Sequence, residues 1–134
     1  MADLSITASD VLVVSGTPST KKAGEAITAG DLVYAFNSTH MKKAANSNAT
    51  VADISGIALN NATLGQTLSY LGAGTVALGT SVLTVAETYC VSNTSGKICP
   101  IGDIGSGEYL SYFGYGGTTS NMTISIEATG LAKA

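Results

Sequence analysis

The side chains with the greatest potential for chemistry in this sequence are Cys90 and Cys99, its only two cysteines. They flank the polar turn 93–96 symmetrically, so pairing of Ser92 with Lys97 would place the cysteines directly opposite each other on neighbouring strands. That geometry is within reach of a cross-strand disulfide. A reducing cytoplasm, however, keeps such thiols reduced. The sequence leaves both states open, a disulfide or two free buried thiols.

No other group of residues matches a catalytic or metal-binding pattern. His40 is the only histidine and lies in a polar stretch without a Ser or Cys nucleophile motif, which predicts an exposed loop residue. Two cysteines and one distant histidine supply too few zinc ligands, at unsuitable spacing. Most of the nine acidic residues fall in expected turns or on outward strand positions. We therefore expect no catalytic residue, no metal and no cofactor, and hence no enzyme.

The elements that would position these side chains are predicted to be short strands. Apolar residues occur in short runs separated by Gly and Asn turn signals, most clearly in the uncharged span 54–86, whose central part 56–79 predicts a β-meander. The clearest single strand is 122–128, where apolar and polar residues alternate. At most one short helical turn is expected, at 49–55.

Further strands are expected from the same signals along the chain. The run Val11–Val14 is apolar on both faces, so it is either central in a sheet or covered by a neighbour. Many short strands without a helical pattern between them predict a single all-β domain over residues 1–134, a compact β-sandwich or barrel of jelly-roll type. The other predicted strands are 3–8, 32–36, 66–71, 75–78, 82–85, 88–91, 97–99 and 108–113.

Charge and composition restrict the partners. Only 11% of the 134 residues are charged, and the formal net charge is −3. The basic pairs Lys21-Lys22 and Lys42-Lys43 are too few to follow a phosphate backbone, so nucleic acid is not expected. A positive mean hydropathy with so few charges indicates that another subunit covers part of the apolar surface.

Neither a membrane span nor a secretion signal is expected. Glycines and polar residues interrupt the uncharged span 54–86, which argues against a membrane helix. The start MADLSITASD lacks the basic region and the apolar core of a signal peptide. We therefore expect a protein that is made in the cytoplasm and does not contact a membrane.

Several pieces of the sequence, taken in order over nearly its full length, resemble the small capsid cement or head-decoration proteins of tailed bacteriophages. These pieces are MADLSITA, AGEAITAGDLVY, GIALNNATLGQTLSYLGAGTVALG, YCVSNTSGKICP, GEYLSYFGYG and ISIEATGLAKA. The resemblance implies an all-β accessory protein that binds the outer surface of the expanded shell of major capsid protein. It also implies a homo-oligomer, a trimer or a dimer, that holds neighbouring capsomers together on the virion without catalytic residues.

Two groups of residues are candidates for contact with the capsid or with another subunit. A strand or arm within residues 1–9 could add to the sheet edge of a partner, through Leu4 and Ile6. The aromatic group Tyr112, Phe113 and Tyr115 is the second candidate. The alternative is that these side chains fill the protein's own core.

A second function class remains open. The stretch AGEAITAGDLV also resembles the SAF-type domain of sugar-acid enzymes and antifreeze-like proteins, which implies a small β-rich module that binds a carbohydrate or another ligand. Such a site would gather Asp31, Tyr34 and Asn37 around a groove. The resemblance covers a small part of the chain.

Overall fold

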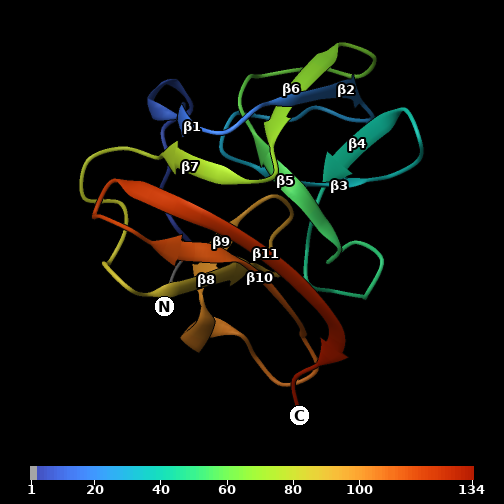
Figure 1. The fold of residues 1–134 in the computed structure, drawn as a ribbon. Coiled ribbons are helices and arrows are strands. Elements are labelled where there is room, and N and C mark those ends of the chain that lie inside the picture. Colours follow the sequence, from blue (N-terminus) through green and yellow to red (C-terminus); the bar gives the residue numbers. More distant parts are fainter. Residues whose placement is uncertain (1–2) are drawn as a thin grey trace.

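The computed structural model of the protein describes residues 3–134. In this range the chain is all-β, as predicted from the sequence, with eleven strands and two three-residue 3₁₀ turns. The strands form two sheets, a closed five-stranded barrel and an open six-stranded sheet, which pack against each other (Figure 1).

The closed barrel is built from five consecutive segments of the first half of the chain. Its strands follow the order β2-β4-β3-β5-β6 around the barrel. Strands β2 and β4 pair in parallel, and the other neighbours pair antiparallel. The strands are β2 (Ser19–Ala23), β3 (Leu32–Ala35), β4 (His40–Lys43), β5 (Ile54–Ala58) and β6 (Thr67–Leu71).

The six-stranded sheet combines one early strand with the second half of the chain. It is antiparallel throughout, in the order β1-β7-β11-β10-β8-β9, so β1 and β9 are its two edges. The turn η1 (Ala8–Asp10) precedes β1, and η2 (Ile101–Asp103) follows β9. The strands are β1 (Leu12–Ser15), β7 (Gly74–Ala77), β8 (Thr88–Val91), β9 (Ile98–Pro100), β10 (Tyr109–Gly116) and β11 (Asn121–Ala132).

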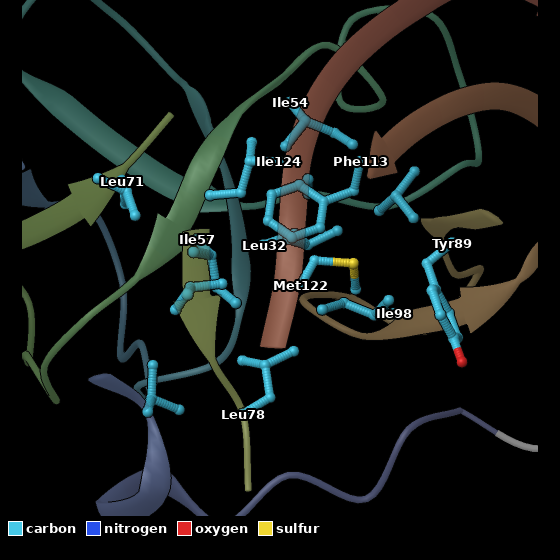
Figure 2. Packing of buried hydrophobic residues seen from close by; sticks show 14 of the residues in the cluster. Leu32, Ile54, Ile57, Leu71, Leu78, Tyr89, Ile98, Phe113, Met122 and Ile124 are labelled. Atoms are coloured by element: carbon cyan, nitrogen blue, oxygen red, sulfur yellow. The ribbon is translucent and has the colours of Figure 1, made fainter. Parts of the chain in front are cut away.

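The main hydrophobic core lies between the barrel and the six-stranded sheet. Alternation along β3 directs Leu32 and Tyr34 into this core, while Val33 joins a smaller cluster inside the barrel. From the opposite side, β10 contributes Phe113 and β11 contributes Met122 (Figure 2). One core therefore holds the inner face of the open sheet against the outer wall of the barrel.

A hairpin tip provides a second link between the two sheets. The tip of the β8–β9 hairpin reaches the barrel, where the Leu32 N–H donates to the Gly96 carbonyl at 2.8 Å and the Gly96 N–H donates to the Ala44 carbonyl at 2.7 Å. Gly96 has a φ of +80°, and a Cβ there would lie 2.9 Å from Cγ of Asp31. A side chain at this position would be both strained and crowded.

The predicted central meander is wrong. Strands β5 and β6 are neighbours in the barrel, but β7 crosses to the other sheet and pairs there with β1 and β11. Gly74 makes the crossing possible, because its φ is +109° and a Cβ would lie 2.2 Å from the Ser15 carbonyl oxygen. The approach of two backbones, rather than a tight turn, explains a glycine at this point.

Three shorter segments also differ from the expected elements. Residues 82–85 form no strand, although Val85 makes an isolated bridge with Gly116. Of the segment 49–55, only residues 49–52 form a hydrogen-bonded turn, because β5 already begins at Ile54, and the two 3₁₀ turns lie elsewhere. The segment 3–8 alternates in burial as predicted, but it joins neither sheet as a strand.

Candidate functional site

The β8–β9 hairpin places the two cysteines as the sequence predicted. The Ser92 N–H donates to the Lys97 carbonyl at 2.9 Å, and Cys90 lies directly opposite Cys99. Both thiols are free and buried, in a small cluster with Ile104 on the outer face of the sheet. Burial raises the pKa of each thiol to about 12. At neutral pH both therefore stay protonated and are poor nucleophiles and poor metal ligands.

The polar residues proposed for a ligand groove serve separate structural tasks. Asp31 is buried and accepts the Thr28 N–H at 3.0 Å, and burial raises the pKa of its carboxyl group. The Asn37 side-chain oxygen accepts the His40 N–H at 2.9 Å and thereby holds the β3–β4 turn. Tyr34 packs in the main core. These three side chains do not form the common groove that the sequence suggested.

His40 is a strand residue rather than the exposed loop residue predicted. It is the first residue of β4, it is partly buried, and its Nδ1 lies 2.7 Å from Oγ1 of Thr39. Within the part of the chain that the structure describes, no group of three or more His, Cys, Asp and Glu side chains could hold a metal ion.

The N-terminal candidates, Leu4 and Ile6, lie against the protein's own core. Both are half-buried and pack on the main cluster. The Leu4 N–H donates to the Ile98 carbonyl at 2.8 Å, so this segment covers part of the β9 edge. Ile6 is close to Gly30, where a Cβ would lie 2.9 Å from Cγ2 of Ile6. Residues 1 and 2 of the proposed arm lie outside the described range.

The aromatic candidates divide between the two faces of the open sheet. Phe113 is fully buried in the main core, so it has no surface to offer a partner and leaves the set of contact residues. Tyr112 is half-buried and Tyr115 is 46% exposed. Both line an open hollow of about 390 Å³ on the outer face, together with residues of β8, β11 and η2. The outer face of β10 is therefore a candidate binding surface.

The most unusual surface is the edge strand β1. Leu12, Val13 and Val14 are 63%, 38% and 55% exposed, and β1 pairs only with β7. In the sequence, residues 11–14 are apolar on both faces, which predicted a strand that is central in a sheet or covered by a neighbour. Within the described chain β1 is neither, so the edge remains open to another strand.

The opposite edge of the same sheet is protected. Strand β9 has only three residues and ends at Pro100, which has no N–H to donate. The Leu4 N–H already occupies the Ile98 carbonyl. The fold thus blocks one edge of the sheet and leaves the other edge apolar, uncharged and free of proline.

Comparison of the sequence with known protein families and curated sequences finds no relative. Neither a protein-family model nor a curated protein sequence matches the chain. Among residues 3–134, no helix is long and apolar enough to cross a membrane.

Proposed function

We propose that this chain is a capsid cement protein, which binds the outer surface of an assembled bacteriophage shell and holds neighbouring capsomers together. The observation that carries the proposal is the open apolar edge of β1. The sequence resemblance to head-decoration proteins supplies the partner, the major capsid protein. A surface that suits association with another strand fits a structural role in a large assembly.

Edge strand β1 can bind a partner by strand addition. Its outward N–H and C=O groups would pair with a strand of the partner, while Leu12 and Val14 would gain cover from partner side chains. No charge lies within β1 to oppose such pairing. Because a shell offers many equivalent sites, even a modest contact at each copy becomes a strong attachment when the copies also bind one another.

Lysine substitutions in β1 test this role directly. Expanded shells of the encoding phage that lack the protein are mixed with it and sedimented, and bound protein is measured against major capsid protein. We expect saturation at a fixed ratio for the native chain and at least about tenfold weaker binding for Leu12→Lys and Val14→Lys, because a charged edge disfavours strand pairing.

The matched control is Leu64→Lys, which places the same charge on a leucine that is 72% exposed in a barrel loop. It should bind shells like the native chain. If Leu12→Lys and Val14→Lys also saturate shells with native affinity, β1 is not the docking edge. If the native chain stays in the supernatant at every salt concentration, the cement function itself is refuted.

A further inference from the structure

The hollow on the outer face of the open sheet combines aromatic rings with hydroxyl groups. It lies over β8, β10 and β11, which are neighbours in the sheet (Figure 1), and η2 forms one wall through Ile101. Two cross-strand pairs fall within it, Tyr112 opposite Glu127 and Tyr115 opposite Thr88. Residues that are distant in the sequence therefore meet on one face.

Several polar groups in this hollow have no hydrogen-bond partner within residues 3–134. They are the side-chain oxygens of Thr88, Tyr112, Tyr115, Ser125 and Glu127, all of which line the hollow. Four of these groups are hydroxyls, each able to donate and to accept, and the fifth is a carboxylate acceptor. Together they can serve a ligand that presents hydroxyl groups of its own.

We propose that this hollow binds a neutral carbohydrate. A sugar ring has apolar faces of C–H groups that pack on aromatic side chains, and a rim of hydroxyls that needs both donors and acceptors. The hollow supplies both, and its volume of about 390 Å³ suits one or two sugar residues. This inference is independent of the proposed cement function.

The charge in the hollow selects the class of carbohydrate. Glu127 is the only charged residue among its lining residues. An anionic sugar or a phosphate would face this carboxylate without a compensating cation. Neutral hexoses and N-acetylhexosamines avoid that repulsion, and Glu127 can accept hydrogen bonds from their hydroxyls.

The floor of the hollow is held in place by packing. Tyr112 lies against the cluster of Cys90, Cys99 and Ile104, which fixes its ring from below. Gly114 is buried and lies between the two tyrosines on β10. A Cβ at this position would lie 2.2 Å from the Thr123 carbonyl oxygen, so a larger residue would disturb the strand pairing there. A site whose groups are already positioned loses less entropy on binding.

The test is binding of the full chain to an array of neutral oligosaccharides that end in glucose, galactose, mannose or N-acetylglucosamine, with sialylated counterparts beside them. Hits are then titrated in solution by NMR. We expect saturable binding to at least one neutral sugar with a dissociation constant on the order of 1 mM, because the hollow is open and small. Resonances of Tyr112 and Tyr115 should shift on binding.

Three variants in the hollow and one control variant on the barrel localise the site. Tyr115→Ala and Glu127→Gln should each weaken binding about tenfold, through a lost ring contact and a lost charge-assisted hydrogen bond. Phe36→Ala, which removes an aromatic ring that is 52% exposed on the barrel, should bind like the native chain. Ser125→Ala removes one hydroxyl group on β11 and should weaken sugar binding by a smaller factor than Tyr115→Ala or Glu127→Gln.

Three results would overturn the proposal. The first is that no neutral sugar shows saturable binding at sugar concentrations up to about 10 mM. The second is that the chain prefers the sialylated sugars over their neutral counterparts. The third is that Tyr115→Ala and Glu127→Gln both bind the sugar with native affinity. Circular dichroism of each variant distinguishes loss of the site from loss of the fold. None of these outcomes depends on capsid binding, so the two proposals fail or succeed separately.

Discussion

Truncation of Phe113 tests the division of the aromatic residues between core and surface. A buried phenylalanine removes roughly 200 Å² from water, which corresponds to about 5 kcal/mol. Because Phe113 is fully buried between the two sheets, we expect Phe113→Ala to lower the free energy of unfolding by about 3–5 kcal/mol. Tyr115→Ala, two residues along the same strand but 46% exposed, should cost less than about 1 kcal/mol.

Urea unfolding followed by far-UV circular dichroism measures both effects. With a slope of about 2 kcal/mol per molar urea, Phe113→Ala should move the midpoint down by roughly 2 M, and Tyr115→Ala by less than about 0.5 M. If Phe113→Ala is too unstable to purify, Phe113→Leu preserves most of the volume and should cost about 1–2 kcal/mol. Equal midpoints for Phe113→Ala and Tyr115→Ala would refute the assignment of Phe113 to the core.

Two predictions concern pH. Because burial holds the pKa of Cys90 and Cys99 at about 12, above the ordinary 9.0 that the unfolded chain regains, stability should fall as pH rises from 9 towards 12. Urea unfolding at several pH values should show this decline in the free energy of unfolding. If a double Cys90→Ala, Cys99→Ala variant shows the same decline, the two thiols are not its cause. Burial likewise raises the pKa of Asp31, so its contribution to stability should fall as pH rises above its ordinary value of 3.8. Asp31→Asn can still accept the Thr28 N–H, and it should remove this dependence of the free energy of unfolding on pH in the acid range. If the pH dependence of this variant in the acid range equals that of the native chain, the raised pKa of Asp31 is contradicted.

Local patterns predicted much of the secondary structure. The β8–β9 hairpin and the pairing of its cysteines were predictable because only a few residues separate the two strands, so turn chemistry sets their register. The alternation along β11 was also visible, since Met122 and Ile124 are buried while Ser125 and Glu127 are exposed. In both cases the signal comes from residues close together in the chain.

Sheet assignment was not predictable in the same way. Strand β7 follows β6 closely in the sequence, yet it pairs with β1 and β11 in the other sheet. Its hydrophobic pattern suits either sheet equally well. The choice depends on burial against distant strands and on the close backbone approach at Gly74, neither of which leaves a local pattern.

The candidate sites, too, were only partly predictable from local sequence patterns. The sequence marked Val11–Val14 as apolar on both faces, but only the strand order reveals that Leu12, Val13 and Val14 form an open edge. It marked the tyrosines of β10 as a group, but not the partners that complete the hollow. Thr88 and Glu127 come from separate strands and meet only because β8 and β11 flank β10.

The sequence by itself determined that this chain is all-β, roughly where most of its strands lie, and which cysteines face each other. These properties follow from side-chain alternation and turn residues, which act over a few positions. Tertiary structure decided which strand lies at an open edge, which aromatic ring is buried, and which polar groups share a hollow. These follow from hydrogen bonding and burial between distant segments, whose outcome depends on the whole chain at once.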